Sequence, residues 1–197
     1  MARDLVNVDP SDGRSPMAAA IHRPSQPHEY PGELERDLVT RNGGTVHLRP
    51  IRPADAPRLV EFHSQLSPRS VYLRYFTAHP TLSAVEVERL ATVDYWDRLA
   101  LIAEDGDRMI AVGRYDRLDH GEEAEVAFVV ADDYQRHGIG SLLLEQLAIA
   151  ARERGITAFR AETLYENRRM LDVFMHSGLE VQSTTDHGVV ELRLSIC

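Results

Sequence analysis

The sequence of 197 residues contains no lysine, and all 22 of its basic residues are arginine. The chain therefore has no lysine side chain of its own to modify, and it lacks the Gly-Lys-Ser/Thr that a Walker nucleotide-binding loop requires. Its single cysteine, Cys197, excludes an intramolecular disulfide and favours a reducing compartment. No apolar run approaches the roughly 20 residues that span a bilayer, and no continuous apolar segment of signal-peptide type begins the chain. We therefore expect a cytoplasmic protein with no membrane partner.

Positive charge is also scarce, because 31 acidic residues outnumber 22 basic ones and the net charge is −9. A general nucleic-acid binder would need a basic face, so the balance argues against nucleic acid and is compatible with a basic partner such as a lysine-bearing protein surface. The 9 histidines are scattered and form no His-x-x-x-His or Cys/His cluster, so no metal site is expected. No Gly-x-Ser-x-Gly elbow supports a serine hydrolase.

Residues 1–40 differ from the rest of the chain in composition. They contain five prolines among Ser, Asp, Gly and His, and no period of 2 or 3.6 persists. This composition predicts a disordered or loosely attached extension over 1–40, with a short helix over 32–39 at its end. A folded domain is then expected over 41–197.

From Thr45 onward the pattern alternates between strands and helices. The capping signals are a Ser67-Pro68 start and a Ser83/Glu86 capping box. The expected strands are 45–51, 99–104, 109–118, 123–130, 157–163, 179–184 and 189–196. The expected helices begin at Asp55, Ser67 and Ser83, and two more cover 138–154 and 167–176. This order predicts an α+β fold of three layers, in which helices flank a mixed, mostly antiparallel sheet.

The segment Gln135-Arg136-His137-Gly138-Ile139-Gly140 lies where a strand gives way to a helix. Unpaired N–H groups at a helix start, together with the helix dipole, make a ready site for a phosphate. The two glycines let the backbone approach a bulky anion, and Arg136 adds a charged donor. A dinucleotide fingerprint would need a third glycine, but Leu143 stands there. The turn therefore predicts a site for a different phosphate-bearing ligand.

The pattern Gln-x-x-Gly-x-Gly, preceded by the strand AEVAFVV, closely resembles motif A of the GNAT acetyltransferases. A second signature follows in Asn167, Met170, Phe174 and the pair Gly178-Leu179, which resembles the Asn-x-x-(Ala/Met)…Gly-Phe helix of that family. The resemblance extends from about residue 45 to residue 196. Within the family, Ser67-Pro68 and the run YLRYF over 72–76 look most like the bacterial Pat-type protein lysine acetyltransferases.

The resemblance implies that acetyl-CoA is the cosubstrate and that its diphosphate lies on the N–H groups of 136–141. The pantetheine arm would pair like an extra strand with β-strand residues 128–130, where the sheet splays open. Asn167 would contact the pantetheine and also cap the last helix. The implied cofactor-binding residues are Phe128, Val129, Val130, Gln135, Arg136, His137, Gly138, Ile139, Gly140, Ser141 and Asn167.

Glu125 occupies the position that the resemblance assigns to the catalytic base, and Glu123, two residues earlier on the same face, is the second candidate. Two nearby carboxylates could raise the pKa of one of them. Many relatives carry a tyrosine as general acid on the last helix, but Phe174 stands there, and Tyr165 is a remote substitute. The leaving thiolate is then protonated by water or departs as the anion.

We therefore expect an N-acetyltransferase that moves an acetyl group from acetyl-CoA to a primary amine by direct attack in a ternary complex. The resemblance favours a protein lysine as acceptor and suggests an acyl-CoA synthetase as the protein that bears it. A small-molecule amine, such as a polyamine, amino acid or antibiotic, is an alternative acceptor. A non-catalytic acyl-CoA-binding module is the alternative from another class. Tyr72, Arg74, Tyr75 and Phe76 lie on a helix that borders the acceptor groove in this family, and they either shape that groove or pack in the core, with Arg74 on the surface.

Overall fold

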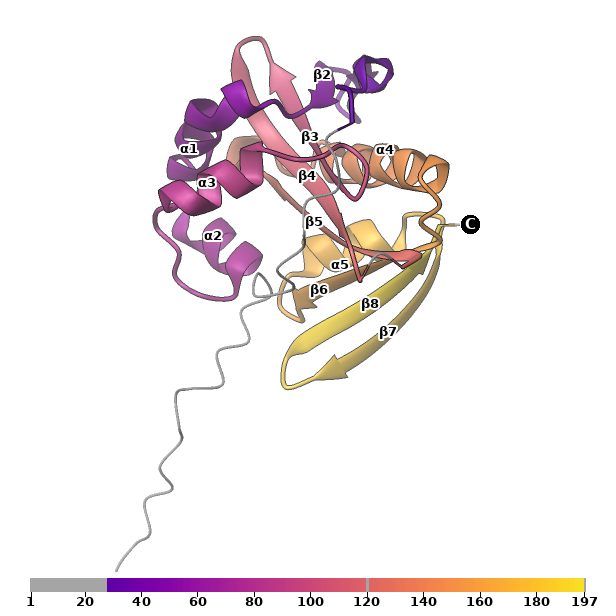
Figure 1. The fold of residues 1–197 in the computed structure, drawn as a ribbon. Coiled ribbons are helices and arrows are strands. Elements are labelled where there is room, and N and C mark those ends of the chain that lie inside the picture. The colour runs from indigo at the N-terminus through magenta and orange to yellow at the C-terminus, as the bar shows by residue number, and fades with distance from the viewer. Residues whose placement is uncertain (1–27, 120, 197) are drawn as a thin grey trace, which may run out of the picture.

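The structure is a computed structural model that describes residues 28–119 and 121–196. Within these ranges the strands form one sheet in the order β1-β2-β3-β4-β5-β6-β8-β7. Neighbouring strands are antiparallel throughout, except for the parallel pair β5 and β6. The predicted mixed, mostly antiparallel sheet is confirmed (Figure 1).

The elements follow the predicted order from Thr45 to the C-terminus. The strands are β1 (Arg36–Val39), β2 (Thr45–Pro50), β3 (Arg98–Asp105), β4 (Arg108–Arg117), β5 (Glu123–Val130), β6 (Ala158–Leu164), β7 (Glu180–Asp186) and β8 (Val189–Ser195). The α-helices are α1 (Ala56–Ser64), α2 (Pro68–Tyr75), α3 (Ala84–Ala91), α4 (Ile139–Glu153) and α5 (Arg168–Met175). Short 3-10 turns cover η1 (Gly32–Leu34), η2 (Pro53–Asp55) and η3 (Asp132–Tyr134).

Figure 1 shows α1, α2 and α3 on one face of the sheet and α4 and α5 on the other, so the three expected layers are present. A hydrophobic cluster lies on each face. Beneath α4 and α5 it includes Leu143, Phe159 and Phe174, all of which are buried. Beneath α1, α2 and α3 it includes Phe62 and Tyr75. The sheet therefore holds its middle strands, including β5, between two cores.

The N-terminal part of the domain differs from the expectation. The helix expected over 32–39 is wrong, because Gly32–Leu34 forms a single 3-10 turn and Arg36–Val39 forms the edge strand β1. Leu38 of β1 is the register partner of Val46 in β2, and Leu34 is buried in the core. Residues 36–39 thus belong to the sheet, and the 3-10 turn before them packs on its core, ahead of the boundary expected at residue 41. Residues 1–27 of the expected extension lie outside the described residues.

Candidate active site

The turn before α4 presents a row of backbone amides. Gly138 is the N-cap, in the left-handed region at φ +84°, and it has no side chain that could accept a hydrogen bond from the helix. The first bond of the helix is donated by the Leu142 N–H to the Gly138 carbonyl, at 3.1 Å. The N–H groups of Ile139, Gly140 and Ser141 precede that bond and have no intrahelical acceptor. Together with the helix dipole, they form a site suited to an anion.

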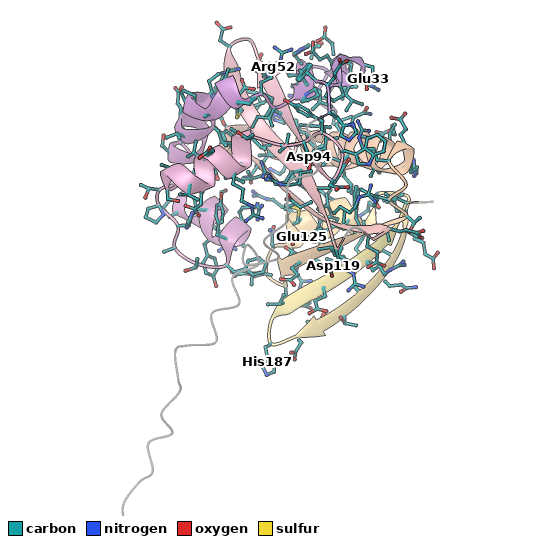
Figure 2. The ribbon with its side chains drawn as sticks, in the orientation of Figure 1. Glu33, Arg52, Asp94, Asp119, Glu125 and His187 are labelled. Atoms are coloured by element: carbon teal, nitrogen blue, oxygen red, sulfur yellow. The ribbon has the colours of Figure 1, made fainter. Side chains whose placement is uncertain are left out.

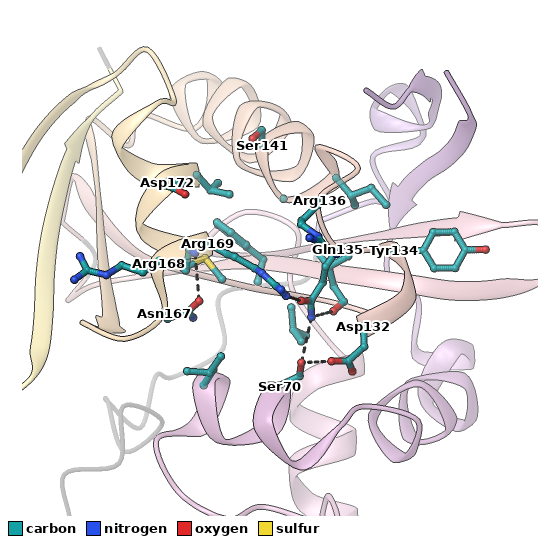
Figure 3. Close-up of a pocket in the computed structure, with 18 of the residues that line it drawn as sticks. Ser70, Asp132, Tyr134, Gln135, Arg136, Ser141, Asn167, Arg168, Arg169 and Asp172 are labelled. Atoms are coloured by element: carbon teal, nitrogen blue, oxygen red, sulfur yellow. Dashed lines mark hydrogen bonds between the residues drawn. The ribbon is translucent and has the colours of Figure 1, made fainter. Parts of the chain in front are cut away.

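The hairpin between β1 and β2 lies beside this turn, as the ribbon at the upper right of Figure 3 shows. The Arg41 N–H donates to the His137 carbonyl at 2.9 Å. A Cβ added at Gly138 would stand 3.3 Å from Cγ of Arg41, a tighter approach than ordinary contact. Glycine at position 138 therefore serves both the left-handed backbone and the close passage of the hairpin.

The sheet divides immediately after Glu125. Strands β5 and β6 pair only at Glu123↔Ala158, Ala124↔Phe159 and Glu125↔Arg160. Beyond that point β5 continues alongside β4 alone, and β6 continues alongside β8 alone. We call this division the fork. Among residues 28–119 and 121–196, it leaves one edge of β5 without a strand partner from residue 126 to residue 130, where the resemblance implies that the sheet opens.

A cavity of about 810 Å³ runs between α2, the fork, the turn and α5 (Figure 3). It brings together most of the residues that the resemblance implies as cofactor ligands: Phe128, Val129, Val130, Gln135, Arg136, Gly138, Ile139, Gly140, Ser141 and Asn167. His137 does not line the cavity. Its carbonyl faces the β1–β2 hairpin, and its ring lies 6.1 Å from the ring of Tyr134.

Arginine side chains make up much of the lining, and the sequence predicted a phosphate contact for only one of them, Arg136. The six are Arg41, Arg69, Arg74, Arg136, Arg168 and Arg169. A usable signal was present in the pair Arg168–Arg169, which occupies the first turn of α5. Positive charge at a helix N-terminus is unfavourable because it opposes the helix dipole. Unfavourable placements of this kind are found most often at functional sites, so the pair indicated a binding role.

The Gln135 side chain joins the walls of the cavity. Its Nε2 donates to Ser70 Oγ at 3.1 Å and to the Val130 carbonyl at 3.2 Å, while its Oε1 accepts from Arg169 (Figure 3). One amide thus ties together α2, the end of β5 and the start of α5. The Val130 carbonyl is already engaged within the protein.

Asp132 fixes the N-terminus of α2 to the end of β5. Its carboxylate accepts hydrogen bonds from the Ser67 N–H at 2.9 Å, from the Ser67 hydroxyl at 2.7 Å and from the Ser70 hydroxyl at 2.7 Å. Burial alone would raise the pKa of Asp132, but these hydrogen bonds outweigh it and lower the pKa. The wall formed by α2 is therefore held by an ionised carboxylate.

Asn167 and Phe174 stand at the two family positions on α5. Asn167 Oδ1 accepts from the Met170 N–H at 3.3 Å and so caps the helix, and Asn167 also lines the cavity. Phe174 is buried, with its ring 5.4 Å from that of Phe128. Tyr165 is 50% exposed and does not line the cavity. Neither Phe174 nor Tyr165 thus offers the cavity a proton donor for a leaving group.

Glu125 lies on β5 at the start of the fork, near the middle of the molecule in Figure 2. It is half-buried, and within the described part of the chain its carboxyl forms no hydrogen bond or ion pair. Burial raises its pKa; Arg74 acts against this rise, and the carboxylates of Asp116 and Glu162 add to it. A desolvated carboxyl without a fixed partner is suited to accept a proton.

Glu123 points to the same face but has a different environment. Arg193 Nε donates to its carboxylate at 2.8 Å, and Arg160 donates to the other oxygen. These hydrogen bonds lower the pKa of Glu123. The pKa of Glu125 is raised chiefly by burial and further by the carboxylates of Asp116 and Glu162, so Glu123 is not the second carboxylate expected from the sequence. A paired, ionised Glu123 is a poor base.

Core packing, one of the two roles expected for the aromatic residues at the C-terminal end of α2, is found for Tyr75. Tyr72 does not line the cavity, and a role for it at the acceptor groove stays a prediction. Tyr75 is buried in the cluster beneath α1, α2 and α3, whereas Tyr72 is 41% exposed.

Among the described residues, no helix is long and apolar enough to cross a bilayer, and no group of three His, Cys, Asp or Glu side chains is placed to hold a metal ion.

Comparison with known proteins places this geometry in a family. The family model described as "Acetyltransferase (GNAT) family" matches residues 67–179. Acetyltransferase PA5475 of Pseudomonas aeruginosa is 30% identical over 149 residues, covering 74% of this chain and 80% of that protein. Acetyltransferase Pat of Mycolicibacterium smegmatis is 33% identical over 162 residues, or 81% of this chain, but the match spans only 48% of Pat. This chain therefore spans about half the length of that relative.

A solved structure agrees with these matches. The crystal structure of the GNAT domain of S. lividans PAT has 44% sequence identity and a TM-score of 0.80, covering 85% of this chain and 99% of that domain. The amide row, the forked sheet and these matches agree, and this chain belongs to the GNAT acetyltransferase family.

Proposed function

We propose that this chain transfers an acetyl group from acetyl-CoA, the acyl donor of its family, to a primary amine on a protein lysine. The observation that carries the proposal is one cavity that extends from the amide row at the start of α4 along residues 128–130 of β5, on the strand edge that opens after Glu125. Glu125 itself does not line this cavity and lies three residues before its nearest lining residue on β5, Phe128. A phosphate-bearing ligand held at the turn could extend along the fork, so that its reactive end lies near a desolvated carboxyl.

The residues of the cavity fit acetyl-CoA. The N–H groups of Ile139, Gly140 and Ser141, with Arg136, would hold the diphosphate, and the glycines leave the backbone accessible. The unpaired edge of β5 would bind the amide groups of the pantetheine as a neighbouring strand does. Asn167 lines the same stretch. When bound, acetyl-CoA supplies the acetyl group as an activated thioester.

Glu125 would remove the proton from the attacking amine, directly or through water. The raised pKa makes it a stronger base than a solvated glutamate, and its carboxyl forms no competing hydrogen bond within the described residues. A backbone N–H along the open edge of β5 would stabilise the oxyanion. Since Phe174 carries no proton donor, the thiolate would be protonated by water or leave as the anion.

A protein acceptor is favoured by the surface beside Glu125. On this face the outward side chains of β6 and β8 are polar and partly or fully exposed, namely Arg160, Glu162, Glu191 and Arg193. The similarity to Pat supports a protein lysine, and an acyl-CoA synthetase is the acceptor protein that the resemblance suggests. A small-molecule acceptor would instead call for an enclosed pocket at this point.

Incubation of the protein with labelled acetyl-CoA and a cell lysate, followed by mass spectrometry, tests the proposal. The expected result is label on lysines of lysate proteins, in amounts that fall when Glu125→Gln replaces the wild type. Label confined to small amines would show that the acceptor is a small molecule and not a protein lysine. Tight binding of acetyl-CoA with no labelled product would instead indicate a non-catalytic binding module. The lysine-free chain simplifies the readout, because every labelled lysine belongs to another protein.

A further inference from the structure

The arginines that line the cavity differ in whether they already have a partner. Four are engaged: Arg69 with Glu166, Arg74 with the ring of Tyr75, Arg168 with the ring of Tyr165, and Arg169 with Gln135. Arg41 and Arg136 form no side-chain hydrogen bond, ion pair or ring contact within the described residues. These two guanidinium groups are therefore available to a ligand.

The two available arginines stand at different places along the cavity. Arg136 belongs to the turn itself, at φ +69°, immediately before the amide row. Arg41 comes from the hairpin between β1 and β2, and its side-chain carbons lie 3.3–3.6 Å from the position of a Cβ at Gly138. Its backbone is fixed by the bond to the His137 carbonyl, and the hairpin is closed by a Thr40 N–H to Gly44 carbonyl bond of 2.8 Å. The stem of Arg41 is thus anchored beside the turn.

The next step rests on the proposed function. If the diphosphate of CoA lies on the amide row and the pantetheine extends along β5 toward Glu125, the nucleotide leaves the turn on the side away from β5. Arg41 lies beside the turn on the hairpin of β1 and β2, at the far edge of the sheet from the fork. The ribose of CoA carries a phosphomonoester, which holds about −1.5 to −2 charges at neutral pH. In a chain of net charge −9, such a group needs a nearby cation.

We propose that Arg41 binds the 3′-phosphate on the ribose of CoA and so makes the protein prefer CoA thioesters to their 3′-dephospho analogues. A guanidinium presents a planar fork of donors that matches a phosphate and stays charged at every relevant pH. The diphosphate already has the amide row and Arg136, so Arg41 is the cation left for the third phosphate.

Isothermal titration of acetyl-CoA and of 3′-dephospho-acetyl-CoA into three proteins tests this assignment. Wild type should bind acetyl-CoA about tenfold more tightly than the dephospho form, the size expected for one charge-assisted contact at a partly open site. Arg41→Met keeps an unbranched apolar stem over Gly138 and should abolish the preference, while its affinity for the dephospho form stays within about twofold of wild type. Arg36→Met, on β1 outside the cavity, makes the same change of charge and should leave both affinities unaltered.

The outcomes separate this inference from the proposed function. Equal weakening of both ligands by Arg41→Met would assign Arg41 to the diphosphate and overturn the inference, and so would no change in either affinity. A wild type that binds both ligands equally also overturns it while leaving acetyl-CoA binding intact. A wild type that binds neither ligand overturns the proposed function as well. If thermal melting shows that Arg41→Met is unfolded, Arg41→Gln is titrated in its place with the same expectations.

Discussion

Glu125 occupies an environment that disfavours its ionised form, because burial and the carboxylates of Asp116 and Glu162 outweigh the guanidinium of Arg74. Only the ionised form accepts a proton from an amine. The rate should therefore fall as the pH drops through the raised pKa, and this loss should occur at a higher pH than for an ordinary glutamate near pKa 4.5. A profile of kcat/KM against pH measures this acidic limb. An acidic limb at or below the ordinary glutamate pKa would contradict the assignment.

Replacing the carboxyl tests its role directly. Glu125→Gln should lower kcat by about 10²- to 10⁴-fold at pH 7, the usual contribution of a positioned general base, and leave the Kd for acetyl-CoA unchanged. Glu123→Gln is the matched control two residues away. Because Glu123 is held by Arg160 and Arg193, its loss should lower stability and spare the rate. Normal turnover by Glu125→Gln would show that another group, or water, removes the proton.

Gly138→Asp should weaken acetyl-CoA binding by at least about 100-fold. The new side chain would place a negative charge in front of the amide row and crowd Arg41, which approaches a Cβ at this position to 3.3 Å. The control is Gly155→Asp at the other end of α4. Gly155 has a similar left-handed backbone, φ +74°, but open space around its Cβ position. Titration calorimetry on both variants separates backbone strain, which they share, from blockage of the site, which only Gly138→Asp should show.

At single positions the sequence indicated the type of site better than the role of each residue. Glu123 and Glu125 are two residues apart and therefore lie on the same face of β5. The sequence alone offers no means of telling their environments apart. The difference comes from Arg193, 70 residues away in the chain, which reaches Glu123 across β6. Arg41 was missed for the same reason, because only the fold brings the β1–β2 hairpin to the turn before α4.

At the scale of elements, Asp132 anchors α2 to the rim of the cavity through three hydrogen bonds from Ser67 and Ser70. Asp132→Ala should lower the free energy of unfolding by about 1–2 kcal/mol, since it removes three hydrogen bonds to a charged acceptor whose contribution is reduced by exposure to water. Asp133→Ala is the control, because Asp133 forms an exposed ion pair with Arg108 that should contribute at most about 1 kcal/mol. Urea denaturation at pH 7 compares the two variants.

The same anchor has a defined pH dependence. The pKa of Asp132 is lowered on folding, so its contribution to stability is fully present above the unfolded pKa of about 3.9 and is lost as the pH falls through the folded value. The difference in stability between wild type and Asp132→Ala should therefore shrink in strongly acidic solution. A difference that stayed constant down to pH 2 would indicate that the ionised form of Asp132 is not what holds α2.

Most elements were predictable because their signals are local. The Ser83/Glu86 capping box and the cap formed by Ser67 both form as expected. Strand β1 was not predicted because it has only four residues, follows a proline-rich stretch and gains its hydrogen bonds from β2 rather than from its own neighbours. A short edge strand of this kind depends on tertiary pairing more than on propensity.

At the scale of the whole molecule, the arginine-lined cavity contrasts with a net charge of −9. A polyanionic ligand should be attracted to the cavity locally, and salt should screen that attraction. We expect the affinity for acetyl-CoA to fall by about tenfold or more between roughly 0.05 and 0.5 M salt. S-acetyl-pantetheine carries no phosphate, and its affinity should be nearly independent of salt. If the affinities of acetyl-CoA and S-acetyl-pantetheine fell equally with salt concentration, the arginines of the cavity would not act through charge.

Within the described residues, the fork leaves a strand edge inside the sheet, from residue 126 to residue 130 of β5, that has no strand partner. Unpaired backbone groups on a strand can recruit another extended chain and lead to self-association. A ligand that pairs with β5 would close this inner margin, much as an added strand would. Thorough removal of CoA compounds during purification should therefore make the protein more prone to aggregate, and adding them back should restore solubility together with thermal stability.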